Sequence, residues 1–283
     1  MKNIPRIPTP SAQPCRPWRP DVAIDTESRA EWRLLVLVGL MLLVAVAGPF
    51  IAQSDRYHDF ADHRALAGLP FAMDVLSNLS FAAWGLAGLL LMVMGRPRPD
   101  ASLIATPSLD GSQTGMSILF FGGLVVTAAC SAWYHLQPSD ASLLVDRSGM
   151  VLAFAGLLGL AAGGHASARA GNAVAALVLM AGAASLQVWS AGGNLLPWVV
   201  LQSGGMLLVV WLASQPRRTG ALHIRWVWVI GIYAVAKALE LADHTVYELT
   251  HQWVSGHSLK HVVASFAALP VVMALLARRR SAD

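Results

Sequence analysis

Charged residues are scarce in this sequence. Asp, Glu, Lys and Arg make up 13% of the 283 residues, whereas hydrophobic residues make up 55%. An ordinary soluble domain has about 25% charged residues. Cysteine is also rare, because Cys15 and Cys130 are the only two, and they form neither a disulfide framework nor a CxxC metal motif. With a mean hydropathy of +0.55, the composition excludes an ordinary soluble protein and predicts a polytopic membrane protein.

Long apolar runs support this class. A helix needs roughly 20 apolar residues to cross a bilayer, and eight runs come near that length. They cover residues 34–53, 75–95, 115–135, 144–164, 172–190, 195–214, 224–243 and 258–277. Lipid offers no partner to unpaired backbone groups, and the runs lack the alternation of a barrel strand. The predicted fold class is therefore an all-α membrane protein.

The distribution of basic residues predicts the orientation. If the N-terminus is cytoplasmic, 15 of the 20 Lys and Arg residues fall on cytoplasmic flanks. We expect a multi-pass protein, in the inner membrane if the organism is bacterial, with both termini in the cytoplasm. The pI near 9.4 then reflects topology, and no compact basic patch with interleaved aromatics indicates nucleic-acid binding.

The chain divides into five expected segments. Residues 1–32 contain six prolines and predict a flexible cytoplasmic lead, with no cleavable signal peptide apparent. A first transmembrane helix over 33–54 and an outer loop over 55–73 follow. Residues 74–278 form the main helical core, and 279–283 form a cytoplasmic tail.

Histidines gather on the side expected to face outward. His257 and His261 are four residues apart at the start of the last span, so they share a helix face and can reach one metal ion. Such a pair also occurs at hydrated helix ends without any metal. His135 closes the third span, with Ser131 one turn before it, and Asp146 enters the fourth span. A single His or Asp is common at a helix end. The prediction of a functional site therefore rests on the combination of these residues at one depth in the membrane.

This set of side chains predicts a catalytic metal site. Three neutral imidazoles give zinc three protein ligands and leave the fourth position for water. Zinc lowers the pKa of such a water to about 7 and polarises a carbonyl. Asp146 is then the candidate group for moving the proton. Ser131 is placed to hydrogen-bond the water or the developing oxyanion, because the metal already supplies a nucleophile.

In combination, the motifs resemble the alkaline ceramidases and their bacterial relatives, within a seven-helix superfamily that includes the adiponectin-type receptors. The resemblance covers about residues 74–275. It rests on Ser77-Asn78, on Ser131-x-x-Tyr134-His135 with Asp146-Arg147 and Met150, on Ala236-Lys237-x-x-Glu240-x-x-Asp243-His244, and on Ser255-Gly256-His257 with Lys260-His261.

The resemblance implies that His135, His257 and His261 bind zinc, with Ser131 and Asp146 in the catalytic shell. It also implies a core of seven transmembrane helices, to which the first apolar run adds one N-terminal helix. Lys237, Glu240 and Asp243 follow helical spacing, so locking helices together and binding substrate both stay open for them.

Eukaryotic alkaline ceramidases also carry a calcium site before the first core helix. The corresponding stretch here is Asp59 to Arg64, and Phe71 stands at a later glutamate position. Calcium takes six to eight oxygen ligands. The arginine and the phenylalanine therefore make calcium a doubtful second cofactor beside zinc.

The expected function is that of a zinc-dependent intramembrane hydrolase, which cleaves the amide bond of ceramide or a related N-acyl lipid near the outer face. Its partner is then a membrane lipid substrate, with no nucleic acid, and the oligomeric state stays open. The alternative is a non-enzymatic seven-helix receptor or sensor with a structural zinc site. A transporter is disfavoured, because the inner halves of the spans have almost no charged residues.

Overall fold

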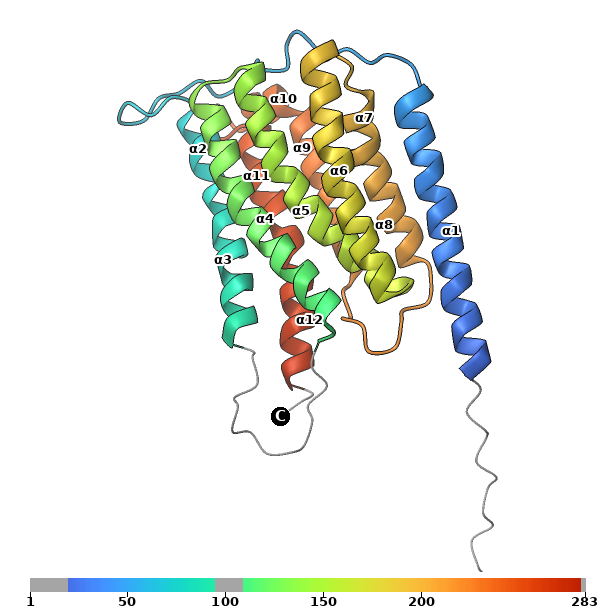
Figure 1. Cartoon of the computed structure of the whole chain (residues 1–283). Coiled ribbons are helices and arrows are strands. Elements are labelled where there is room, and N and C mark those ends of the chain that lie inside the picture. Colours follow the sequence, from blue (N-terminus) through green and yellow to red (C-terminus); the bar gives the residue numbers. More distant parts are fainter. Residues whose placement is uncertain (1–19, 95–108, 281–283) are drawn as a thin grey trace, which may run out of the picture.

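The computed structural model describes residues 20–94 and 109–280 (Figure 1). Within these two ranges, the chain forms helices and turns and no β-strand. Seven helical segments are long and apolar enough to cross a membrane. The predicted all-α membrane class is confirmed.

Most segments consist of one long helix, and three are interrupted. The bounds in chain order are α1 Pro20–Ala47, α2 Ala72–Ser77, α3 Leu79–Met94, α4 Gly111–Leu136, α5 Asp140–His165, α6 Ala168–Gly192, α7 Leu196–Val199, α8 Gly205–Ala213, α9 Trp226–Leu241, α10 Asp243–Leu249, α11 Gly256–Ser265 and α12 Leu269–Arg280.

The seventh predicted span, 224–243, forms α9 and is shorter than expected. Its 16 residues extend about 24 Å at 1.5 Å per residue, whereas the hydrocarbon core is about 30 Å thick. The helix packs against α8 and α11 inside the bundle. It is therefore part of the helix bundle, although it is shorter than the other seven spans.

The first helix differs from its predicted bounds. The sequence predicts a lead over 1–32 and a span over 34–53, but α1 already begins at Pro20 and ends at Ala47. Proline suits the first position of a helix because its missing N–H needs no partner there. Pro49 disfavours a helical conformation at Gly48 and ends the helix early. The lead over 1–19 and the tail over 281–283 lie outside the described residues.

The interior of the bundle is built around α4, α5 and α6. A Cβ atom added at Gly156 of α5 would lie 2.3 Å from the backbone nitrogen of Phe120 in α4. The two helices therefore approach so closely that only a hydrogen fits at this position, a packing mode common between membrane helices. In Figure 1, α1 stands at one edge of the bundle, beside α7 and α8.

Helix interruptions have local causes. The 3₁₀ turn Phe266–Ala268 separates α11 from α12, because Pro270 has no N–H and its ring conflicts with the carbonyl four residues earlier. A π-helical turn, Val200–Gly204, joins α7 to α8. Asn78 separates α2 from α3 and donates from its side-chain nitrogen to the carbonyl of Asp74 (2.8 Å), whereas its Oδ1 is buried without a hydrogen-bond partner.

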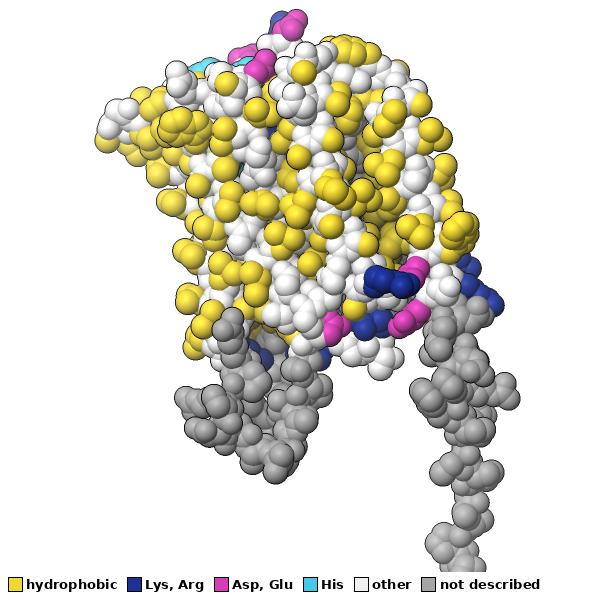
Figure 2. All heavy atoms as spheres, in the orientation of Figure 1, with side chains coloured by type: hydrophobic (Ala, Val, Ile, Leu, Met, Phe, Trp, Pro, Cys, Tyr) yellow, Lys and Arg dark blue, Asp and Glu magenta, His cyan; other side chains and the backbone are white. Residues whose placement is uncertain are grey.

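Polar and apolar surfaces are arranged in bands. Hydrophobic side chains cover the middle of the visible face. Most of the visible Lys and Arg lie at the lower end together with Asp and Glu, and further Asp and Glu lie with His at the upper end (Figure 2). The start of α1 and the end of α12 lie at the same lower end (Figure 1). There Arg218 pairs with Asp110 (2.5 Å) and Arg169 with Glu31 (2.5 Å). Arg169 and Arg218, two of the basic residues predicted to be cytoplasmic, therefore form ion pairs at the same end of the bundle.

The close approach of α4 and α5 can be tested with two alanine substitutions in α5. Gly156→Ala should destabilise the protein by about 1–3 kcal/mol, because its Cβ would overlap backbone rather than a flexible side chain. Gly164→Ala should be neutral or stabilising by up to about 1 kcal/mol, because nothing lies within 4 Å of a Cβ there. Thermal unfolding in detergent measures both. Equal midpoints for the two variants would contradict the packing.

Candidate metal centre

Three buried histidines converge near the upper end of the bundle. His135 lies at the end of α4, and His257 and His261 lie one turn apart on α11. One ring nitrogen from each lies within 4.8 Å of the other two. The exposed fractions are 1%, 8% and 3%. In the described ranges, this is the single group of three His, Cys, Asp or Glu side chains placed to hold a metal ion.

The separation of the nitrogens fits a tetrahedral ion. Nε2 of His135 and Nε2 of His257 are 3.3 Å apart. Two ligands at the zinc–nitrogen distance of about 2.0–2.1 Å, with tetrahedral angles, lie about 3.3–3.4 Å apart. The donor set therefore matches a small divalent ion such as zinc, although imidazoles also suit other transition metals.

Hydrogen bonding orients the ring of His261. Its Nδ1 lies 2.8 Å from Oγ of Ser77, and that hydroxyl donates to the carbonyl of Asp74 (3.0 Å). Because the hydroxyl proton of Ser77 is used in that bond, its oxygen accepts from Nδ1–H of His261. Nε2 of His261 then keeps a free lone pair for a metal. Nδ1 of His135 is buried without a partner. The site thus contains imidazole nitrogens that the protein itself does not satisfy.

The start of α11 is fixed by several contacts. Ser255 caps the helix by accepting from the N–H of Ser258 (2.9 Å). The N–H of His257 donates to Oδ1 of Asp243 (2.7 Å). A Cβ atom at Gly256 would lie 2.3 Å from the carbonyl oxygen of Leu239. The helix start therefore packs directly on the end of α9, which sets the position of both histidines.

The loop between α1 and α2 covers the histidines. The ring of Phe60 is edge-on to His135 and His257, with centroid distances of 4.8 and 4.6 Å. The N–H of Ala61 donates to Oδ2 of Asp243 (2.9 Å), so Asp243 binds both the loop and α11. Sequence reasoning did not identify Phe60, because no local spacing indicates where this loop packs.

Asp146 and Ser131 lie beside the histidines. Ser131 is buried one turn before His135 and donates a hydrogen bond to the carboxylate of Asp146. Asp146 is half-buried on α5 and does not belong to the three-histidine group. The structure thus brings together all five residues that the sequence singled out, with the carboxylate outside the nitrogen cluster.

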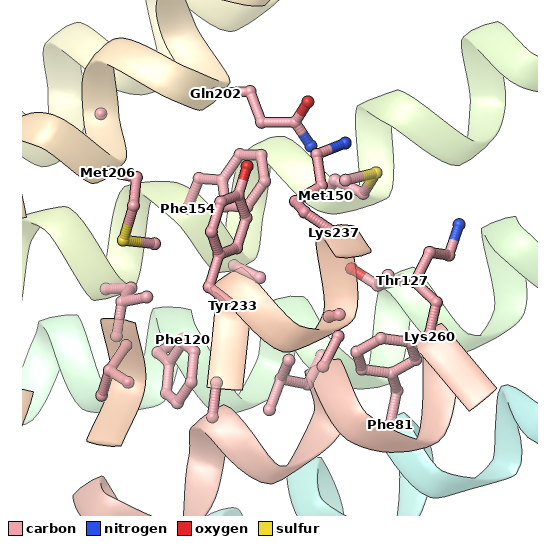
Figure 3. A pocket seen from close by; sticks show the side chains of 18 of the residues that line it. Phe81, Phe120, Thr127, Met150, Phe154, Gln202, Met206, Tyr233, Lys237 and Lys260 are labelled. Atoms are coloured by element: carbon pink, nitrogen blue, oxygen red, sulfur yellow. The ribbon is translucent and has the colours of Figure 1, made fainter. Parts of the chain in front are cut away.

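Two cavities meet at this point. An apolar cavity with about 1080 Å³ of empty space extends into the bundle, and a more polar one lies toward the upper end. His261 lines the first cavity and His257 the second. Both cavities share five lining residues, namely Asp146, Gln202, Lys237, Glu240 and Lys260. In Figure 3, the polar ends of Gln202, Lys237 and Lys260 lie above Phe81 and Phe120. The histidines therefore lie where an apolar chamber joins a polar one.

A cluster of charges lies at the same junction. The carboxylate of Glu240 accepts from Lys237 and from Lys260, the latter at 3.3 Å. Nζ of Lys260 also lies 3.0 Å from Nε2 of His257. The contact of Lys260 joins α11 to α9, as expected for a helix lock, whereas Lys237 and Glu240 pair within α9. Lys260 also places an ammonium group beside a histidine. The sequence predicted the helical spacing of Lys237 and Glu240 but not the contact of Lys260.

Arg147 is buried beside the upper cavity, which it lines together with His257. Its guanidinium lies 4.3 Å from the ring centroid of Trp189 and 5.4 Å from that of Trp198, and it donates to Gln53 (2.8 Å). Aromatic faces attract a cation. The arginine therefore links the segment after α1 to α5 and α6, while its Nε and Nη1 are buried without a hydrogen-bond partner.

The stretch considered for calcium is occupied by an ion pair. Arg64 donates from Nε and Nη2 to the two carboxylate oxygens of Asp62, at 2.8 and 2.6 Å. Burial raises the pKa of Asp62, but the hydrogen bonds and charge of Arg64 outweigh this effect, so the pKa lies below its usual value. The pairing stabilises the loop at neutral pH and is lost as the pH falls through that lowered pKa. Arg64 thus already binds both oxygens of Asp62.

No protein-family model matches this chain, and no curated protein sequence matches it. The resemblance to the alkaline ceramidases therefore stays a prediction.

The metal site predicts a specific response to histidine substitution. Purified protein should hold a single zinc ion per chain, and His135→Ala, His257→Ala or His261→Ala should each lower the occupancy severely, because two remaining ligands bind zinc weakly. His63→Ala is the matched control, since His63 is exposed on the covering loop. Metal analysis by mass spectrometry measures all four. Full occupancy in the three site variants would contradict the assignment.

Proposed function

We propose that this protein is a zinc-dependent intramembrane hydrolase that cleaves the amide bond of ceramide or a related N-acyl lipid. The observation that carries the proposal is the position of the three histidines, at the junction of the apolar and the polar cavity. An amphiphilic substrate has its scissile bond between an apolar and a polar part, so the junction matches the reacting position.

The two cavities suit the two parts of such a lipid. The apolar cavity is lined by side chains of α4, α5, α8 and α9, including Phe120, Leu157, Met206 and Val229. The upper cavity includes Arg56, Asp59 and His244. An acyl chain placed in the first and a headgroup placed in the second bring the carbonyl between them to the histidines.

The residues at the junction have distinct roles in this proposal. Zinc, when bound by His135, His257 and His261, polarises a carbonyl and makes a water molecule more acidic. Asp146 accepts the proton of the attacking water and returns it to the leaving nitrogen. Ser131 donates to Asp146 and thereby holds the carboxylate toward the reacting atoms. Phe60 excludes bulk water from the upper side of the histidine rings.

The proposed orientation follows the basic flanks. Arg169 lies in the first turn of α6, and the start of α6 and the start of α11, which carries His257 and His261, lie at opposite ends of the bundle (Figure 1). Basic flanks favour the cytoplasmic side. The site then faces the periplasm in a bacterial inner membrane, at the depth where headgroups meet acyl chains. A lipid can enter there without leaving the bilayer.

A conservative substitution of Asp146 tests the chemistry. Asp146→Asn should keep zinc, since Asp146 is not among the nitrogen donors, and should lower fatty-acid release by about 10²–10⁴-fold, the usual contribution of a general base. Asp140→Asn is the matched control at the exposed start of the same helix, and it should keep full activity.

Free fatty acid is measured after incubation of detergent-purified protein with a panel of N-acyl lipids that includes ceramides. Equal release by wild type and Asp146→Asn would contradict the role of Asp146. Zinc bound in full by a wild-type protein that releases no fatty acid from any lipid would contradict the hydrolase and favour the receptor or sensor.

A further inference from the structure

Lys260 is a charged neighbour of the metal ligands that the proposed chemistry has not used. Its Nζ lies 3.0 Å from Nε2 of His257, and its side chain is 19% exposed. Nε2 of His257 also faces Nε2 of His135, so it is one of the atoms that would hold the metal. A zinc ion lies about 2 Å from such a nitrogen. Ligands around that ion are therefore within reach of the ammonium group.

The position of the Lys260 ammonium group beside a bound metal ion would be electrostatically unfavourable without a further anion. An ammonium group and a divalent cation at this distance repel each other. Glu240 offsets part of the charge at 3.3 Å, and it is shared with Lys237. Asp146 also interacts electrostatically with Lys260. An oxyanion between the metal and Lys260 is attracted by both cations, which makes this place suited to an anionic ligand.

We propose that Lys260 donates a hydrogen bond to the oxyanion that forms at the substrate carbonyl, and to the carboxylate of the released fatty acid. This inference rests on the proposed function. It adds to that function a cationic donor from the protein, beside the metal, and it defines the ligand class of the junction as acyl oxyanions.

The step balances without any further reactant. The oxygen of water bonds to the carbonyl carbon while Asp146 takes one proton, and the carbonyl π electrons move to the oxygen that accepts from Lys260. When the tetrahedral carbon collapses, the C–N bond breaks and the nitrogen takes the proton from Asp146. The products are a fatty acid and an amine, and Lys260 keeps its own protons throughout.

Glu240 allows the two uses of the cluster to be separated. Lys237 and Glu240 form an i,i+3 pair within α9, whereas Lys260 binds Glu240 from α11, so Glu240→Gln weakens the same lock between α9 and α11 as Lys260→Met. Within the described part of the chain, no hydrogen bond joins Glu240 to a histidine. A role confined to locking helices predicts similar effects of Glu240→Gln and Lys260→Met, whereas an oxyanion role predicts weaker binding in Lys260→Met alone.

The test uses binding of laurate to the full-length protein in detergent, with cobalt(II) in place of zinc. The visible absorption of cobalt reports ligand exchange at the metal and needs no turnover. We expect Lys260→Met to keep the cobalt content of wild type and to weaken laurate binding about ten- to hundredfold, the loss expected for one charge-assisted hydrogen bond. Glu240→Gln should bind laurate no more than about twofold more weakly than wild type, and Lys260→Arg should recover part of the affinity.

The outcomes separate this inference from the proposed function. Equal laurate affinity in wild type and Lys260→Met, similar weakening in Lys260→Met and Glu240→Gln, or a wild-type cobalt site that binds no laurate would each overturn the role of Lys260. None of these depends on lipid hydrolysis. Failure of the hydrolase proposal is seen instead as absent fatty-acid release by zinc-loaded wild type, whatever the laurate affinities are.

Discussion

Three imidazole nitrogens that face one another inside a membrane-spanning bundle are the constraint on which the rest of the site depends. Water does not satisfy buried polar atoms there, so each needs a partner from the protein or a bound ion. Ser77 commits Nδ1 of His261, and the two Nε2 atoms of His135 and His257 remain 3.3 Å apart. The three nitrogens lie close enough together for one metal ion to bind all of them. The surrounding contacts of Asp243 and Phe60 hold the rings in this arrangement.

Interruptions in the helices supply the geometry that straight helices cannot. The break at Asn78 ends α2 directly after Ser77, the residue that orients His261. The π-helical turn Val200–Gly204 contains Gln202, which lines both cavities, and such turns are often found at functional sites. Irregular backbone is tolerated at membrane depth only where protein or a cavity surrounds it. The positions of these breaks are therefore consistent with the position of the site.

Local sequence patterns predicted much of this arrangement, but they did not predict contacts between segments that are distant in the sequence. Hydropathy identified the spans, and the four-residue spacing placed His257 and His261 on one helix face, because both signals are local. The predicted end of the first span lay beyond the end of α1. Hydropathy alone set that prediction, although Pro49 disfavours a helical conformation at the residue before it. The contacts of Phe60, Gln202 and Lys260 were not predicted. Each depends on how distant segments pack, which residue spacing does not encode.

The polarity of the two cavities favours a substrate that brings its own apolar part. A conduction path needs polar groups that continue through the membrane. Below the histidines, the walls are instead formed by Phe120, Leu157 and Val209, which offer no partner to an ion or a proton. Filling such a chamber with an acyl chain removes apolar surface from water, at about 25 cal/mol per Å². In the proposed function, that binding energy would hold the carbonyl at the junction, where the three histidines, Asp146 and Lys260 meet.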